Sequence, residues 1–210
     1  ASWLASERWP SRQLIARSLS RATTAATSSP RIPALDPASA QGQVKDLFAA
    51  VKSQLGVVPN LMRTIAASPA ALEAYLGLNG AVAKGSLTGQ QREQISLAVA
   101  QENHCDYCLA AHTLLGYKSG LTPEQVIATR KGDTAKTGDA KQAGIVSLAK
   151  AVNTKRGQIS DAEFAAAKTA GLTDGDIAEV VVNVALNVLT NYFNNAARTT
   201  VDFPAVPATV

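Results

Sequence analysis

Four helix-start signals recur between residues 88 and 176 of this sequence. Each places a Ser or Thr three residues before a side chain that can reach back to the backbone, and each follows an apolar residue. The four pairs are Thr88–Gln91, Thr122–Gln125, Ser160–Glu163 and Thr173–Asp176. Because such capping boxes satisfy the first free N–H groups of a helix, this half of the chain is predicted to be helical.

Apolar residues at helical spacing extend this prediction to most of the chain. We expect helices near residues 43–56, after Pro59, and near 69–84, 89–102, 105–116, 123–131, 139–153, 161–170 and 174–197. Aromatic residues make up only 5% of the chain, and alternating strand-like runs are few. The sequence therefore predicts an all-α fold.

The first thirty residues differ in composition from the rest. Residues 1–30 hold both tryptophans and carry +3 of the chain's net charge of +4, which leaves +1 for residues 31–210. We interpret residues 1–30 as an N-terminal extension, either a cloning remnant or a natural transit-like segment. The whole chain has 210 residues and 46% hydrophobic side chains, so residues 31–210 are long enough to form one helical domain with its own core.

The charge and hydropathy patterns exclude two classes of partner. Residues 31–210 show no basic patch interleaved with aromatics, so nucleic acid is not expected. No apolar run is long enough to span a bilayer, so no membrane association is expected. Two cysteines without an evident secretory signal favour a cytoplasmic location.

The segment ENHCDYCLAAH, residues 102–112, contains both cysteines and one of the two histidines. At about 100° per residue, Cys105, Cys108 and His112 lie on one side of a helix. A helix start at Asn103 or His104 puts Cys105 in the first turn, where free N–H groups favour a thiolate. A dithiol at this spacing can reduce a peroxide and resolve its own sulfenic acid as a disulfide.

Two other interpretations of this segment stay open. Cys and His side chains at helical spacing can be inert core residues. Cys, Cys and His are also zinc ligands, but a structural site needs a fourth, and His104 or Glu102 would reach the metal only with an awkward bend.

A peroxidase also needs a proton relay, and Glu93 is the candidate acid. On one unbroken helix, Glu93 would lie on a different face from the cysteines. A kink at Asn103–His104 would bring the helices near 89–102 and 105–116 face to face. The alternative is a solvated acid in the first turns of a helix.

The stretch REQISLAVAQENHCDYCLAAHTLLG resembles the carboxymuconolactone decarboxylase superfamily, and within it the AhpD-like alkylhydroperoxidases and peroxidase-related proteins. Members carry a Glu, a gap of eleven residues and then C-x-x-C-x-x-x-H, which falls here on Glu93, Cys105, Cys108 and His112. The resemblance extends from about Pro33 to Pro204. It implies an AhpD-like all-α domain, with the CxxC at the start of a helix, that assembles as a homo-oligomer: a trimer, or an assembly built from trimers or dimers.

The resemblance implies that Cys108 attacks the peroxide, Cys105 resolves the product, and His112 and Glu93 complete the relay. The helix N-terminus by itself favours Cys105 as the more acidic thiol; we favour Cys108 because of the histidine four residues later. AhpD has a histidine between the cysteines, where this chain has Tyr107, so a peroxidase-related relative fits better. Tyr107 is either a hydrogen-bond donor at the cavity or a core residue.

Asparagines repeat every four residues at Asn183, Asn187 and Asn191 on the last predicted helix. Asn is a poor helix former, so this row is either an exposed face or a buried row lining the redox cavity or a symmetry axis. Asn187 and Asn191 are the candidates for lining the cavity.

The sequence as a whole predicts a thiol-dependent hydroperoxidase or disulfide oxidoreductase that needs no tightly bound cofactor. Its expected partners are a small peroxide or disulfide substrate, a thiol or protein-dithiol reductant and further copies of the chain. The alternatives are a carboxymuconolactone-type decarboxylase and a non-enzymatic module that binds zinc or forms an oligomeric scaffold.

Overall fold

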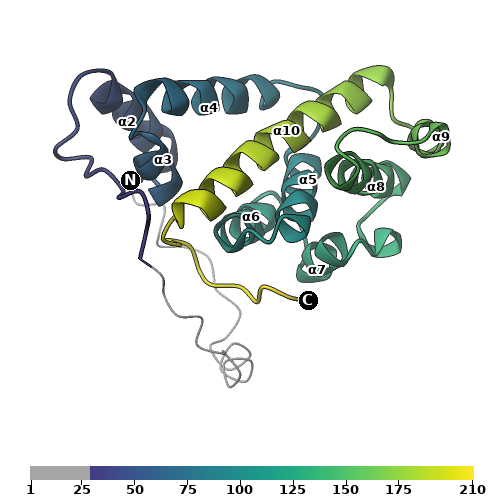
Figure 1. Ribbon diagram of the computed structural model, residues 1–210. Helices are drawn as coiled ribbons and strands as arrows, with labels where there is room; N and C mark the ends of the chain where they lie inside the picture. The colour runs from purple at the N-terminus through teal and green to yellow at the C-terminus, as the bar shows by residue number, and fades with distance from the viewer. Residues whose placement is uncertain (1–28) are drawn as a thin grey trace.

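The computed structural model describes residues 29–210 as helices joined by short loops, with the long helix α10 crossing the molecule diagonally (Figure 1). No strand occurs within these residues, so the all-α prediction is confirmed. The elements are α2 (Gly42–Leu55), α3 (Asn60–Ile65), α4 (Pro69–Val82), α5 (Gly89–Glu102), α6 (Asp106–Lys118), α7 (Pro123–Lys131), the short 3-10 helix η2 (Thr134–Lys136), α8 (Ala140–Thr154), α9 (Asp161–Thr169) and α10 (Asp174–Ala197).

Helix α5 lies at the centre and packs against α6, α7, α8 and α10. Every residue from 94 to 100 is buried, so this helix has no solvent-facing side over two turns. Its one long polar side chain there is satisfied: Gln94 donates to the Thr137 carbonyl at 2.6 Å and accepts from Gln142 at 3.2 Å. A helix surrounded in this way is a rigid support for the side chains that it carries.

Two main apolar clusters fill the spaces on either side of α5. The first joins α2, α3 and α4 to the start of α6 and the C-terminal half of α10, and Leu72 and Leu109 are among its fully enclosed members. The second joins α5, α8, α9 and α10 around Ile95, Ile145 and Val180. Because α10 contributes to both clusters, it holds the two halves of the bundle together.

The predicted helix starts are confirmed. Capping boxes with both reciprocal hydrogen bonds begin α5, α7, α9 and α10 at the four Ser/Thr positions identified in the sequence. Asp139 and Gln142 form a fifth box at the start of α8, which the Ser/Thr pattern missed because the cap is an aspartate.

A tight turn joins α5 to α6 and reverses the chain direction. His104 has a left-handed φ of 51°, and the N–H groups of His104 and Cys105 bond back to the carbonyls of Gln101 and Ala100. This pairing is a Schellman motif, which ends α5 and lets α6 fold back against it. The predicted kink is confirmed, but α6 begins at Asp106, so Cys105 is its N-cap rather than a first-turn residue.

None of the helices formed by residues 29–210 has the length and apolar character needed to cross a bilayer. The N-terminal extension is assigned to residues 1–30, of which residues 1–28 lie outside the described part of the chain.

We expect Thr88→Ala to lower the free energy of unfolding by about 1 kcal/mol, because the α5 N-terminus loses the side chain that accepts from Gln91 N–H. Urea denaturation followed by circular dichroism measures this change. Thr88→Ser keeps the hydroxyl and is expected to restore most of the stability. Equal stability of the wild type and Thr88→Ala would contradict a role for this cap.

Candidate functional site

The two cysteine sulfurs meet at the N-terminus of α6. Cys105 Sγ and Cys108 Sγ lie 2.7 Å apart as free thiols, and both residues are buried. Cys105 also caps the helix, since its sulfur accepts from Cys108 N–H at 3.4 Å. The spacing of two residues between the cysteines therefore places both sulfurs in one enclosed space, at a distance from which they can form a bond after oxidation.

The two thiols are electrostatically unequal. The hydrogen bond from Cys105 lowers the pKa of Cys108 to about 7, against the effect of burial, with further lowering by His112, Asn194 and Asn191. The same hydrogen bond, together with burial and the Cys108 charge, raises the pKa of Cys105 far above its usual range. Cys108 is thus the sulfur that carries negative charge near neutral pH, and Cys105 keeps its proton.

Glu93 and His112 form a hydrogen-bonded pair beside the sulfurs. His112 Nδ1 lies 2.8 Å from Glu93 Oε2, and both side chains are mostly covered. Burial acts to lower the pKa of His112, but the Glu93 carboxylate outweighs it and raises that pKa. The Schellman turn makes this contact possible, because it folds α6 back along α5.

A cavity of about 80 Å³ opens next to this pair between α4, α5, α6 and α10. Its volume suits a small molecule or a few waters rather than a bulky ligand. Most of its polar lining comes from α5 and α10. The lining residues are Tyr75, Asn79, Val82, Ala83, Arg92, Glu93, Ser96, His112, Asn183, Leu186, Asn187 and Thr190.

Tyr75 is a lining residue that the sequence did not indicate. Burial, followed by the nearby charges of Cys108 and Glu93, raises the pKa of its phenol to about 12. The hydroxyl therefore stays protonated and available as a donor at neutral pH. Tyr75 belongs to α4, far from the cysteine segment in sequence, and no local pattern around it distinguishes it from a core tyrosine.

The remaining candidates occupy different positions. Asn187 lines the cavity, whereas Asn191 lies behind it near the sulfurs, and both are buried rather than exposed. Tyr107 is not among the lining residues. Its hydroxyl accepts from Leu61 N–H at 3.0 Å, and its ring packs edge-on against Phe203 with centroids 5.5 Å apart. Tyr107 therefore lies in the core between α6, α3 and the C-terminal segment.

The described residues contain no group of three or more His, Cys, Asp and Glu side chains arranged to hold a metal ion. His104, one of the two possible fourth zinc ligands, is exposed on the turn. The other, Glu102, pairs with Lys150 at 2.8 Å. Neither side chain is directed to the cysteine pair as a ligand.

Residues 69–138 match the family described as carboxymuconolactone decarboxylase. The matched segment contains Glu93, both cysteines and His112, and it runs from the start of α4 to just before α8. This segment of the chain is therefore similar to the carboxymuconolactone decarboxylase family. No curated protein sequence matches this chain.

Solved structures of similar proteins support the fold assignment. A peroxidase-related protein from Ralstonia eutropha JMP134, described as an alkylhydroperoxidase AhpD core, has 23% identity and a TM-score of 0.75, covering 82% of this chain and 92% of its own. A peroxidase-related protein from Silicibacter sp. TM1040 has 22% identity and a TM-score of 0.72, with coverage of 82% and 92%. The debrominase Bmp8, solved with 2,3,4-tribromopyrrole, has 16% identity and a TM-score of 0.71, with coverage of 83% and 92%. This chain therefore has the AhpD-like helical fold.

We expect Glu93→Gln to lower the pKa of His112, because the amide removes the charge that opposes the effect of burial. The chain has only two histidines, so the pH titration of their ring protons by NMR resolves both. His104→Gln assigns the exposed ring. A His112 titration that is unaffected by Glu93→Gln would show that the pair does not form in solution.

Proposed function

We propose that this protein is a thiol-dependent hydroperoxidase that uses Cys105 and Cys108 as a dithiol–disulfide pair. The single observation that carries the proposal is the contact of a low-pKa sulfur with a protonated one, 2.7 Å apart and beside a Glu–His pair. The thiolate is the nucleophilic form of cysteine, and an adjacent thiol is the group that resolves its oxidation product. The Cys108 thiolate is therefore the attacking group and Cys105 the resolving one.

The reaction begins with attack of the Cys108 thiolate on one oxygen of the peroxide. The O–O bond breaks, Cys108 becomes a sulfenic acid, and the other oxygen leaves as an alkoxide or hydroxide that takes up a proton. The Cys105 sulfur then attacks the sulfenic sulfur, which forms the disulfide and releases water. A thiol or dithiol reductant returns two electrons and two protons to close the cycle.

The Glu93–His112 pair supplies the proton that the leaving oxygen needs. The raised pKa of His112 keeps this side chain protonated over a wider pH range. Its ring lines the cavity where a peroxide would lie. The imidazolium also lowers the pKa of Cys108 through its charge, although it is not hydrogen-bonded to the sulfur. Glu93 therefore acts by orienting and charging the histidine.

The cavity favours small substrates. Its volume of about 80 Å³ accommodates hydrogen peroxide or a short organic hydroperoxide. Both sulfurs are nearly inaccessible and neither lines the cavity, so a small peroxide needs a smaller local opening to reach them than a protein disulfide does. A small peroxide is thus the substrate class that we propose, with a thiol or protein dithiol as reductant and the cytoplasm as the location.

Peroxide consumption with a dithiol reductant tests this proposal. We expect Cys108→Ser to abolish turnover, and Glu93→Gln to reduce it by about a hundredfold, the usual contribution of a positioned acid or base. Glu102→Gln is the matched control, because Glu102 lies on the same helix but pairs with Lys150 away from the sulfurs. Equal rates in wild type, Cys108→Ser and Glu93→Gln would remove the enzyme hypothesis.

Cys105→Ser separates attack from resolution. In that variant we expect one turnover, after which a sulfenic-acid trap labels Cys108 and is detected by mass spectrometry. Labelling of Cys105 in Cys108→Ser, without labelling of Cys108 in Cys105→Ser, would reverse the two roles.

The family name suggests a lactone decarboxylase as the alternative. Such an enzyme would place its chemistry on the histidine and the acids and would tolerate loss of both thiols. The contact between the two sulfurs, and the low pKa of one of them, favour thiol chemistry.

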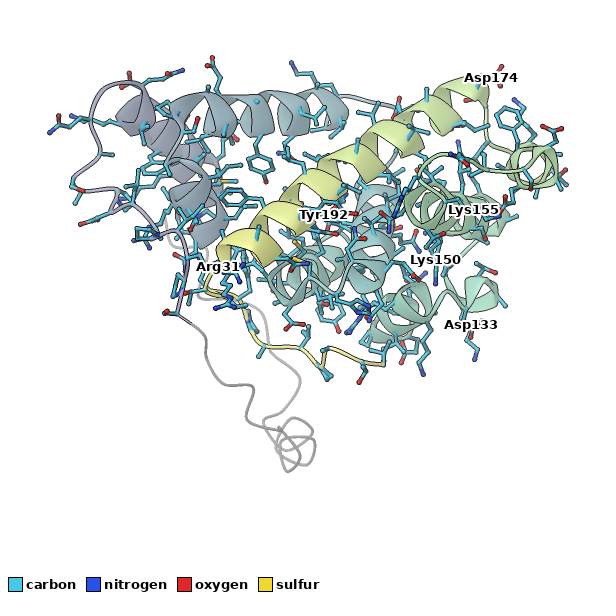
Figure 2. The ribbon with its side chains drawn as sticks, in the orientation of Figure 1. Arg31, Asp133, Lys150, Lys155, Asp174 and Tyr192 are labelled. Carbon is cyan, nitrogen blue, oxygen red and sulfur yellow. The ribbon has the colours of Figure 1, made fainter. Side chains whose placement is uncertain are left out.

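We also propose that the protein assembles as a homo-oligomer through α10. This helix buries its asparagine row together with apolar core residues, while a second apolar row at helical spacing faces outward. Tyr192, 59% exposed, marks the outward row in Figure 2. The outward row consists of Val181, Ala185, Leu189 and Tyr192. An exposed apolar row of this kind is typical of a protein–protein interface.

Light scattering coupled to gel filtration tests the assembly. We expect the wild type to be oligomeric and Leu189→Glu to dissociate it, because a charge would be buried at the interface. Phe164→Glu on α9, another exposed apolar position, is the control and should leave the assembly intact. A monomeric wild type would contradict the proposal.

A further inference from the structure

Two buried asparagines of α10, Asn191 and Asn194, differ from the rest of the asparagines on that helix. Asn183 and Asn187 use their side-chain amides to donate to the carbonyls of Glu179 and Asn183, at 2.8 and 2.9 Å. The side-chain N–H groups of these two residues therefore find their acceptors within their own helix. Asn191 and Asn194 make no such bond within the described residues, although both are buried.

Asn194 donates directly to the reactive sulfur. Its Nδ2 lies 3.3 Å from Cys108 Sγ, and its Oδ1 is buried without a partner. The carboxamide could turn over to direct its oxygen at the sulfur, but an oxygen lone pair would then face a negative charge. The orientation with the nitrogen toward the sulfur is therefore the one that suits a thiolate.

Asn191 is oriented by a third asparagine. Its Oδ1 accepts from Asn103 Nδ2 at 3.0 Å, which fixes the direction of the carboxamide. Its Nδ2 is buried and makes no hydrogen bond, to oxygen or to sulfur, within the described residues. Asn191 is nevertheless among the groups that lower the pKa of Cys108. Because a buried N–H without an acceptor is costly, ionisation of Cys108 is the change that would give this donor a negative charge to interact with.

We propose that Asn191 and Asn194 form an anion cradle that holds the Cys108 sulfur in its thiolate form, with Asn103 orienting Asn191. Both asparagines are positioning residues, since they act on the sulfur and not on the peroxide. The cradle deepens the proposed function, and it rests on that function only in naming Cys108 as the reacting sulfur.

The cradle has a consequence for the redox equilibrium. Forming the disulfide removes the negative charge, so the two amides lose the interaction that they make with the thiolate. The cradle therefore stabilises the reduced pair relative to the disulfide and makes the disulfide a stronger oxidant. This effect is present where the sulfur is ionised, above pH about 7, and disappears below it.

The test measures the thiolate without using peroxide. Absorbance at about 240 nm during a pH titration, together with iodoacetamide rates, gives the pKa of Cys108 in the reduced protein. We expect Asn194→Leu and Asn191→Leu each to raise that pKa by about one unit, and so to slow alkylation about tenfold below pH 7. Asn194→Asp keeps the shape and places a negative oxygen at the sulfur, so its shift should be larger.

Asn195→Leu is the matched control, an exposed asparagine of the same helix whose amide donates to the Asn103 carbonyl. It should leave the Cys108 titration close to that of the wild type. Circular dichroism verifies that each variant is folded. If a leucine variant does not fold, Asn194→Asp and Asn194→Gln provide the measurement instead.

Equilibration with dithiothreitol supplies a second readout. In Asn194→Leu we expect the equilibrium constant for exchange with dithiothreitol to shift toward the protein disulfide by about tenfold near pH 9, which corresponds to about 30 mV. Near pH 5 the constant should match that of the wild type. The cradle would be overturned if none of the Asn191 and Asn194 variants changed the Cys108 titration or the equilibrium constant. If the wild type consumes no peroxide while the variants show these shifts, the proposed function is overturned and the cradle is supported.

Discussion

The contact between Glu93 and His112 depends on the turn at Asn103 and His104. Those two side chains are nineteen residues apart on consecutive helices and would diverge if α5 continued straight into α6. The left-handed conformation of His104 ends one helix, and the two backbone bonds across the turn fix the direction of the next. The same turn places Cys105 at the N-cap of α6 and its sulfur against Cys108, so the candidate site follows from one backbone reversal.

Burial helps to separate the pKa values of the two thiols. Two thiols in water would ionise at similar pH, whereas here one sulfur donates its hydrogen and the other receives it in a site shielded from solvent. Each further donor or charge then acts on the sulfur that has already become the acceptor. In a low-dielectric interior these interactions act strongly, so the Cys105 hydrogen bond, with one imidazole and the buried amides, lowers the pKa of Cys108 despite its burial.

Helix α10 connects this site to the outer surface. It buries its amides against the sulfurs and the cavity, and it leaves apolar side chains outside. An ordinary surface helix has polar side chains outside, whereas α10 is apolar on its outer side as well as toward the core. The helix also spans both main apolar clusters, so the position of its asparagines is held from both ends of the bundle.

The sequence by itself determined the helices, because capping boxes, Gly and Pro act through neighbouring residues. It also placed Cys105, Cys108 and His112 on one side of a helix, and the kink followed from the need to bring Glu93 near them. Only the tertiary structure decided that the asparagine row is buried, that Tyr107 packs in the core while Tyr75 lines the cavity, and that Asn194 reaches Cys108 from 86 residues away. Those outcomes depend on how whole helices pack against one another, and helical periodicity shows which residues share a face without showing what that face meets.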